Sequence, residues 1–570
     1  MAVVAATALA TPLLLGAAPF HGPSHGHGHS KPGAGHSKGP SKEAVKLSRE
    51  LVKNASARDA YRHLQQFQAI ADSAGGHRAA GSLGHDASAA YVYRQLQRAG
   101  YQVSYQTFSF VYTETLAEKL AVVSPSPRDV TIKAMTYTPS TRVGGLTAGL
   151  AAVPVDDTTG CEASDYASAN FTGKIALIKR GGCTFADKQA AAAAAGAAGA
   201  VIYNNTEGAL SGTLGEVGAG KIPTGGVTQE EGEKLAADAA AGDVTVSFEI
   251  RELQENRTTR NVVADTRTGK AANTVVLGAH LDSVTEGPGI NDNGSGSAGL
   301  LEVALELAKS KSKPANKVRF AWWSAEENGL LGSEAYVASL SETQRQQIKL
   351  YLNFDMIASP NGVQFVYDGD DSDGVGAGPG PEGSAQLERD INEFLDSKGK
   401  KHEGTDFTGR SDYGPFIEVG IPSGGTFTGA EGLKTAAQAR TYGGQEGVAY
   451  DPCYHEACDD LSNISMKHFD VNIDVIANAV GTYAHDLRSL TRPVTPSPST
   501  GTPGSGGGPA RRPRPRGHGV TPTLGARANT YARTHTHALS TPQAKGQTPP
   551  ACGVPARPPP LPPLWGGPHP

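Results

Sequence analysis

Several stretches of the sequence place histidine or carboxylate side chains at the ends of apolar runs. In AHLDS, His280 and Asp282 stand two positions apart after the run TVVLGAH. Residues two apart on a strand project to one face, so one can bind a metal ion while the other orients it. Ordinary polar groups are the alternative for this pair. Asp292 follows in the turn GPGINDNGSGSAG, as expected of a loop that delivers a carboxylate to a metal ion.

Two further runs end in carboxylates. Glu326 and Glu327 follow the apolar run FAWW and lead into Gly329, so one could bind metal while the other accepts a proton; a solvated turn is the alternative. Asp355 interrupts the apolar run in YLNFDMI. Burying an unpaired carboxylate is costly, so we expect a cation or hydrogen-bond donors beside it, and a salt bridge to an Arg is the alternative.

The segment DPCYHEACDD places His455 between Cys453 and Cys458. A thiolate zinc cluster would need more ligands than two cysteines and one histidine, so we expect a disulfide ring that fixes the orientation of Tyr454 and His455. The histidines and carboxylates form an N/O set that suits zinc, and five ligands with one shared carboxylate make a two-metal site. The candidate ligands are His280, Asp292, one of Glu326 and Glu327, Asp355 and His455.

The elements around these residues alternate between strands and helices. Strand-like TVVLGAH, KVRFAWWSA and LYLNFDMI are each followed by a helical pattern, and a last helix is expected at about 466–487. This alternation predicts an α/β fold with a doubly wound, mostly parallel sheet and a site along the carboxyl ends of its strands. Residues 42–112 are expected to contribute helices and a strand to the same domain, which continues over 253–488.

A middle segment, 115–251, differs in texture because it is β-rich and Gly-rich, and we expect it to be an inserted domain. Residues 1–41 combine an apolar run of signal-peptide length with a His- and Gly-rich arm, and 489–570 form a Pro-, Gly-, Ser- and Thr-rich tail. Neither end has the periodic apolar residues that a core requires. The apolar start and two local cysteine pairs predict a secreted protein, and no later stretch is long enough for a membrane span.

The charge distribution bears on the partner. The chain has 51 Lys and Arg and 56 Asp and Glu, and eight of the basic residues but no acidic ones follow Pro509. The rest therefore carries 43 basic against 56 acidic residues, a net charge of −13. An acidic body argues against nucleic acid as the partner, because phosphate binding needs a positive field.

The order His, Asp, Glu-Glu, Asp, His resembles the co-catalytic zinc aminopeptidases of the streptomycete leucine-aminopeptidase type in peptidase family M28. The resemblance covers about 42–112 and 253–488 and implies the zinc exopeptidase fold. It implies that His280 and Asp355 hold one zinc ion and Glu327 and His455 the other, with Asp292 between them.

The same resemblance implies roles for residues that do not hold zinc. Asp282 orients His280, and Glu326 is the general base. Tyr454 stabilises the oxyanion, and Arg410 positions the substrate. Asp470 and Asp474 could retain a calcium ion.

The middle segment resembles a protease-associated domain through TGKIALIKRGGCTFADKQAAAAAAGAAGAVIYNN. In that family the domain gates the substrate and has no catalytic residues of its own. The resemblance also implies a disulfide between Cys161 and Cys183. Cys552 in the tail is then left over.

These features predict a monomeric zinc exopeptidase that removes an apolar, Leu-like residue from the free amino terminus of peptides. A carboxypeptidase or a single-zinc glutaminyl cyclase could use the same scaffold. The cyclase is weakened by the complete ligand set, and a carboxypeptidase would need several basic groups where only Arg410 is evident. The alternative from another class is a non-catalytic binding protein, which the presence of every ligand and of Glu326 disfavours.

Overall fold

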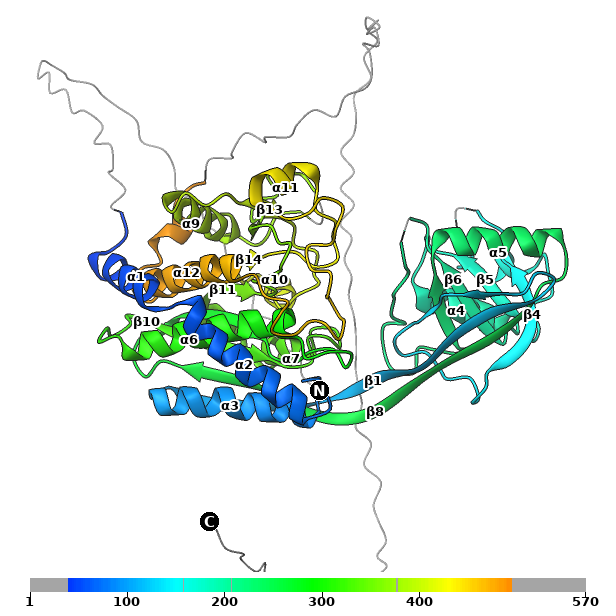
Figure 1. Ribbon diagram of the computed structural model, residues 1–570, viewed down its shortest axis with the longest axis horizontal. Helices are drawn as coiled ribbons and strands as arrows, with labels where there is room; N and C mark the ends of the chain where they lie inside the picture. The colour runs from blue at the N-terminus through cyan, green and yellow to red at the C-terminus, as the bar shows by residue number, and fades with distance from the viewer. Residues whose placement is uncertain (1–38, 157, 207, 376–377, 495–570) are drawn as a thin grey trace, which may run out of the picture. The chain divides into compact units, whose positions relative to one another are not determined.

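The computed structural model describes residues 39–156, 158–206, 208–375 and 378–494 (Figure 1). The predicted signal and almost all of the His-rich arm lie outside these residues, as do the tail from 495 and Cys552. Within the described part, no helix combines the length and apolar character that a membrane crossing requires.

A mostly parallel sheet forms the centre of the peptidase part. Its strand order is β13-β12-β14-β11-β9-β10-β8, with β1 (Gln102–Ser124) paired to β8 (Thr245–Asp265). The central strands β14, β11, β9 and β10 are mutually parallel, whereas β12 and β8 are antiparallel to their neighbours β14 and β10. The bounds are β9 Lys270–His280, β10 Asn316–Trp323, β11 Ile348–Phe354, β12 Phe365–Tyr367, β13 Glu403–Thr405 and β14 Ser423–Phe427. The expected doubly wound α/β fold is confirmed.

Helices cover both faces of this sheet because its strands are apolar on both sides. On β9, Val275 and Leu277 pack with one set of helices and the intervening Val276 with another. The first set is α1 Lys42–Asn54, α2 Ala57–Ser73, α3 Leu83–Ala99, α6 Gly296–Lys309, α9 Ser384–Ser397 and α12 Met466–Tyr483. The second set is α7 Leu331–Ser339 and α10 Gly414–Glu418, and the short helices α8 Glu342–Gln347 and α11 Ala436–Tyr442 bury none of their residues.

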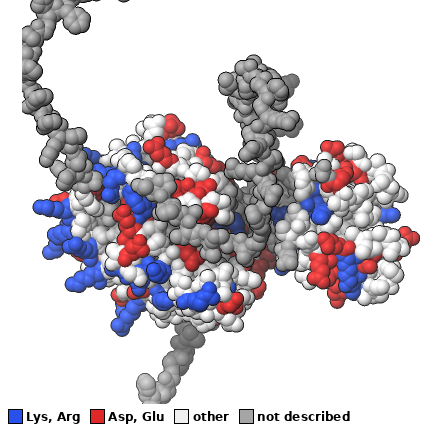
Figure 2. Space-filling model, turned by 90° about the horizontal axis from the view of Figure 1, so that it is seen from above, with Lys and Arg blue, Asp and Glu red and all other residues white. Residues whose placement is uncertain are grey.

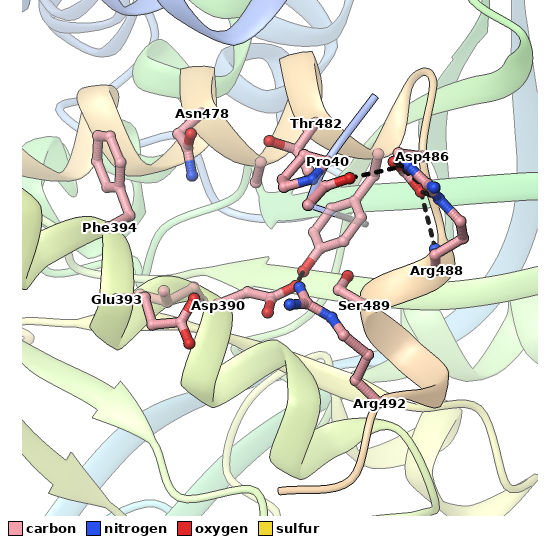
Figure 3. A pocket seen from close by; sticks show the side chains of 14 residues that line it. Pro40, Asp390, Glu393, Phe394, Asn478, Thr482, Asp486, Arg488, Ser489 and Arg492 are labelled. Atoms are coloured by element: carbon pink, nitrogen blue, oxygen red, sulfur yellow. Dashed lines mark hydrogen bonds and ion pairs between the residues drawn. The ribbon is translucent and has the colours of Figure 1, made fainter. Parts of the chain in front are cut away.

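The beginning and end of the described chain are linked by hydrogen bonds. Ser41, which caps α1, donates its N–H to the Asp486 carboxylate at 2.7 Å, and the Arg488 guanidinium pairs with the same carboxylate. A cavity of about 210 Å³ lies beside this link, between α9, α12 and residues 486–492 (Figure 3). At its wall the Tyr483 hydroxyl donates to the Asp390 carboxylate. The Ser41–Asp486 bond joins the start of α1 to the residues after α12, and the Tyr483–Asp390 bond joins α12 to α9.

The inserted part is entered and left through two long antiparallel strands, β1 Gln102–Ser124 and β8 Thr245–Asp265. The first four residues of β8 pair with β4 and its last four with β10, so this strand belongs to both parts. The predicted boundaries at 112–115 and 251–253 fall inside these continuous strands, where the register shifts between Thr115 and Ala117. The domain limits themselves stay a prediction.

The inserted part has its own sheet and its own core on each face. Strands β4, β5, β6 and β7 run parallel, and β3 is antiparallel to β7. The elements are β2 Arg128–Val130, β3 Lys133–Ala134, β4 Leu146–Ala152, β5 Ile175–Lys179, α4 Phe185–Ala194, β6 Gly199–Tyr203, β7 Thr224–Val227 and α5 Gln229–Ala241. Ile175 and Leu177 face one core and Ala176 and Ile178 the other. A disulfide joins Cys161 to Cys183, as the resemblance implied.

The surface carries both signs of charge. On the face drawn in Figure 2, Lys and Arg side chains gather along the outer edge of the larger body, whereas Asp and Glu side chains lie nearer its middle.

Candidate active site

Three adjacent parallel strands bring the predicted site residues to one edge of the sheet. His280 is the last residue of β9, Glu326 and Glu327 follow β10, and Asp355 follows β11. Since β9 lies between β10 and β11, the carboxyl ends of these strands meet with His280 in the middle. This is the edge at which α/β proteins with open sheets place their ligands.

His280 is surrounded by carboxylates. Its Nε2 lies 3.2 Å from both Asp292 Oδ1 and Asp355 Oδ1, and 3.9 Å from Glu326 Oε2. On the other side of the ring, Nδ1 lies 3.7 Å from Asp282 Oδ1 and 3.3 Å from the Asp282 carbonyl. Asp282 is therefore placed to fix the orientation of the ring, which leaves Nε2 facing the acidic cluster.

Asp292 lies between the two histidines. Its Oδ1 faces His280, and its Oδ2 lies 3.3 Å from Nε2 of His455. The same His455 nitrogen lies 3.1 Å from Glu327 Oε2. One carboxylate thus presents a separate oxygen to each histidine, so Asp292 could serve as a shared ligand if each histidine held a metal ion.

Burial and mutual interactions shift the pKa values of the histidines and carboxylates in this cluster. Burial alone would lower the pKa of both His280 and His455, but the surrounding carboxylates outweigh it and raise both, that of His455 to about 11. Burial and the nearby Asp292 raise the pKa of Glu327 to about 7. Burial would raise the pKa of Asp292, but hydrogen bonds from the two histidines hold it below its usual range.

The donor set fits divalent zinc. Two of the candidate metal-binding groups lie here, each with its ligand atoms within 4.8 Å of one another: one comprises His280, Asp292 and Glu327, and the other His280, Glu326 and Asp355. Glu327 Oε1 is buried without a hydrogen-bond partner, although a buried carboxylate oxygen normally has one. Imidazole nitrogens with carboxylate oxygens are ligands that zinc accepts. A cation at this position would satisfy the unpaired oxygen and offset the acidic charge.

Unusual backbone conformations occur at or next to several of these site residues. Ala325, Met356 and His455 have φ angles of 59°, 46° and 58°. Such left-handed conformations cost energy for residues other than glycine, and they persist only where the surrounding structure enforces them. For His455 the enforcing structure includes the predicted disulfide ring, Cys453–Cys458, which is present.

A second group of polar residues lies at the rim. The Arg410 guanidinium pairs with Glu431 at 2.6 Å and donates to the Tyr454 hydroxyl at 3.3 Å. Burial, with Asp292 and Glu327 nearby, raises the pKa of Tyr454 and keeps its hydroxyl protonated. The Tyr454 hydroxyl is therefore available as a donor beside the cluster.

These residues line a cavity of about 320 Å³. Its apolar wall is formed by side chains from β11, β12, β14 and the following loops, namely Met356, Phe365, Phe427 and Tyr450. Its acidic lining residues are Asp292, Glu326, Glu327, Asp355, Asp406 and Glu431. Arg410 is the one Lys or Arg among the described lining residues. The cavity thus combines an apolar wall with a strongly acidic floor.

The calcium expectation finds no matching cluster. Asp470 accepts a hydrogen bond from the Ala57 N–H, and Asp474 lies 3.4 Å from the Lys398 ammonium. Neither is among the candidate metal-binding groups of the described residues. A calcium ion at Asp470 and Asp474 stays a prediction.

Comparison with known proteins places the chain. The model of peptidase family M28 matches residues 261–480, and that of the PA domain matches 146–235. Leucine aminopeptidase 2 of Trichophyton rubrum is 42% identical over 449 residues, which are 78% of this chain and 88% of the relative. An aminopeptidase of Pseudomonas aeruginosa is 46% identical over 446 residues, 75% of this chain and 81% of the relative. The chain belongs to peptidase family M28.

Solved structures agree with this membership of family M28. An aminopeptidase from Aneurinibacillus sp. strain AM-1 superposes with a TM-score of 0.62 at 30% identity, covering 79% of this chain and 98% of that one. A zinc aminopeptidase from Bacillus subtilis gives a TM-score of 0.54 at 28% identity, covering 75% and 94%. The expected zinc-dependent aminopeptidase with an inserted PA domain is confirmed, and with it an enzyme rather than a non-catalytic binding protein.

Some residues of this M28 site were not found from the sequence. Ser411 donates to Asp355 Oδ2 at 2.6 Å, and Glu431 pairs with Arg410. Asp459 accepts the N–H groups of Asn291 and Asp292. Ser411 is adjacent to Arg410 and Asp459 belongs to DPCYHEACDD, so proximity to a motif could have indicated both. Nothing in the sequence pattern singles out Glu431.

Proposed function

We propose that this peptidase removes an apolar, Leu-like residue from the free amino terminus of peptides, with two zinc ions and Glu326 as the general base. The observation that carries the proposal is the position of Asp292, whose two oxygens face His280 and His455 separately. In this assignment His280 and Asp355 hold one zinc ion, Glu327 and His455 hold the other, and Asp292 is shared.

The two zinc ions, when bound, supply Lewis acids that polarise the scissile carbonyl and make water a nucleophile at neutral pH. Glu326 takes the proton of the attacking water and passes it to the leaving amine. Its carboxylate lies on the same side of His280 as Asp355, next to the cavity. The Tyr454 hydroxyl donates to the developing oxyanion, and Arg410 holds Tyr454 and the substrate at the rim.

The charge of the cavity favours an amino terminus over a carboxyl terminus as the group that is bound. Six carboxylates and a single guanidinium line it, and that guanidinium, Arg410, is already paired with Glu431. In the proposed assignment the two zinc ions offset the charge of Asp292, Glu327 and Asp355, while Glu326 and Asp406 remain as carboxylates that hold no zinc ion. A cationic amine can bind such carboxylates, whereas no free Lys or Arg lines the described cavity to bind a substrate carboxylate, which supports the aminopeptidase.

The apolar wall supports an apolar residue at the cleaved terminus. Met356, Phe365, Phe427 and Tyr450 offer aliphatic and aromatic surface without a charge. Several curated relatives are named leucine aminopeptidases, which agrees with a Leu-sized side chain. The alternative of a glutaminyl cyclase on this scaffold would need one zinc ion and would leave the ligands of the other ion without a role.

We further infer that the protein works outside the cell as a monomer. Two disulfides join Cys161 to Cys183 and Cys453 to Cys458, and such bonds persist in oxidising compartments. We also propose that the peptidase domain comprises 42–112 and 253–488 and the inserted domain 115–251.

The test compares leucine p-nitroanilide with its N-acetylated form and with a peptide whose carboxyl terminus alone is free. We expect hydrolysis of the free-amine substrate only, its loss after dialysis against a chelator, and its return when zinc is added. Release of the carboxyl-terminal residue from the peptide whose carboxyl terminus alone is free would contradict the proposal and indicate a carboxypeptidase.

A further inference from the structure

We propose that Arg78 is a positioning residue of the zinc site, whose buried guanidinium holds the loop 281–289 and thereby sets the place of Asp282 and Asp292. This inference rests on the two-zinc site proposed above. Arg78 lies between α2 and α3, outside the residues 261–480 that the family model matches. The amino-terminal helical segment would therefore have a role in the site.

The guanidinium of Arg78 is fully buried and bonded to backbone carbonyls. Nε donates to Pro288 O at 2.8 Å and Nη2 to Gly289 O at 2.5 Å, while Nη1 donates to Leu281 O. The backbone N–H of Arg78 donates to Ser283 Oγ at 2.9 Å. The carbonyls of both ends of the loop therefore converge on one side chain, and an arginine has enough donors in a fixed plane to bind all three.

The backbone amides of residues 290–292, which follow this loop, are bound by a residue of another segment. Asp459 accepts the N–H of Asn291 at 2.8 Å and the N–H of Asp292 at 2.9 Å, and its carbonyl accepts the N–H of Ile290 at 2.9 Å. Asp459 stands four residues after His455. Arg78 thus binds the carbonyls of the loop 281–289 and Asp459 binds the amides of the three residues that follow it, so His280, Asp292 and His455 are tied to a common frame.

The close approach of Arg78 depends on a glycine. Gly289 has a φ of 60°, and a Cβ atom there would lie 2.4 Å from Ser283 Cβ and 3.2 Å from Arg78 Nη2. A side chain at this position would push the loop away from the guanidinium. The contact between this loop and Arg78 therefore requires glycine at position 289.

The charge of Arg78 also acts on the acidic cluster. Burial lowers its pKa to about 10, against the opposing effect of Asp282, Asp459 and Asp292, so it stays protonated at neutral pH. The guanidinium carbon Cζ of Arg78 lies over the Phe67 ring, 5.2 Å from the ring centroid. A fixed positive charge behind the cluster reduces repulsion among the carboxylates before any metal ion binds.

The test is the zinc affinity of the metal-free protein, measured by competition with a chromophoric chelator, in Arg78→Lys and Arg78→Met. We expect zinc to bind roughly 10- to 100-fold more weakly in Arg78→Met, as is usual when a residue that supports metal ligands is lost, and by a smaller factor in Arg78→Lys. The visible spectrum of the cobalt-substituted protein should change, and kcat should fall more than KM rises.

Arg319 provides the matched control. It is a largely buried arginine of the same domain whose guanidinium binds Asp265 through two nitrogens and also donates to Tyr336. Arg319→Lys should lower the melting temperature but leave zinc affinity and the cobalt spectrum unchanged. A merely structural arginine would show the same pattern at position 78.

The proposal is overturned if either Arg78 variant folds and binds zinc with the affinity and cobalt spectrum of the parent protein. It is also overturned if neither variant folds when zinc is in excess, because Arg78 would then serve general stability. If the parent protein itself binds no zinc, the proposed function fails instead, and the two failures are distinguishable.

Discussion

Glu326 and Glu327 are neighbours in the sequence but meet different partners. Glu327 reaches His455 at 3.1 Å, whereas Glu326 lies 3.9 Å from His280 and lines the cavity. Ala325, with its left-handed backbone, turns the chain just before them. These separate partners agree with the proposed roles, in which Glu326 is the base and Glu327 a zinc ligand.

The role of Glu326 predicts a defect in chemistry rather than in binding. Glu326→Gln keeps the shape but cannot accept a proton, so kcat should fall by roughly 10²- to 10⁴-fold. Zinc content, measured by metal analysis, should stay at the parent value. Glu342→Gln, at an exposed position on α8, is the control and should have parental kcat. A Glu326→Gln enzyme with near-parental kcat would exclude this residue as the base.

The hydroxyl of Tyr454 can be tested alone. Tyr454→Phe removes the donor and the contact with Arg410, while the ring can stay in place. Loss of one oxyanion donor should lower kcat by roughly 10²- to 10³-fold with little change in KM. Steady-state kinetics on leucine p-nitroanilide give both constants, and a change confined to KM would show that the hydroxyl binds substrate only.

At the scale of elements, the disulfide ring holds a strained backbone. Replacing both Cys453 and Cys458 by Ser should destabilise the protein by about 2 kcal/mol according to the loop-entropy estimate for so short a ring. Because His455 has a φ of 58°, loss of the ring should also weaken zinc binding. Denaturant unfolding and chelator competition measure the two effects. The ring would be shown to have no part in the site if stability fell and zinc affinity did not.

The sequence predicted correctly the strands that carry the candidate site, because each could be recognised from its own apolar residues. The apolar runs that became β9, β10 and β11 end in the predicted site residues, and parallel pairing alone brings those ends together. The continuation of β1 and β8 through the predicted boundaries was not foreseen, because each strand needs the other as its partner across more than a hundred residues of inserted chain. Arg78 was missed for the same reason, since its contacts are more than two hundred residues away.

At the scale of the whole molecule, Asp486 links the beginning and end of the described chain. The Arg488 guanidinium and the N–H groups of Arg488 and Ser41 lower the pKa of Asp486 to about 2. The unfolded chain binds this proton more tightly, so the link adds stability above about pH 4 that is lost as the pH falls toward 2. Screening by solvent limits the gain to about 1 kcal/mol or less.

Asp486→Asn should therefore lower the unfolding free energy at pH 7 by about 1 kcal/mol or less, and the difference from the parent should shrink below about pH 4. Denaturant titrations at both pH values measure it. A difference that grew at low pH would have the wrong sign for a carboxylate with a lowered pKa.

The two-metal site is the central claim, and a calorimetric titration of the metal-free protein with zinc tests it most directly. We predict two equivalents for the parent protein and about one tight equivalent for His455→Ala, in which the ligand pair of the second ion is broken. Activity should return fully only at the second equivalent. Saturation of binding and activity at a single equivalent, with the same stoichiometry in His455→Ala, would contradict the account.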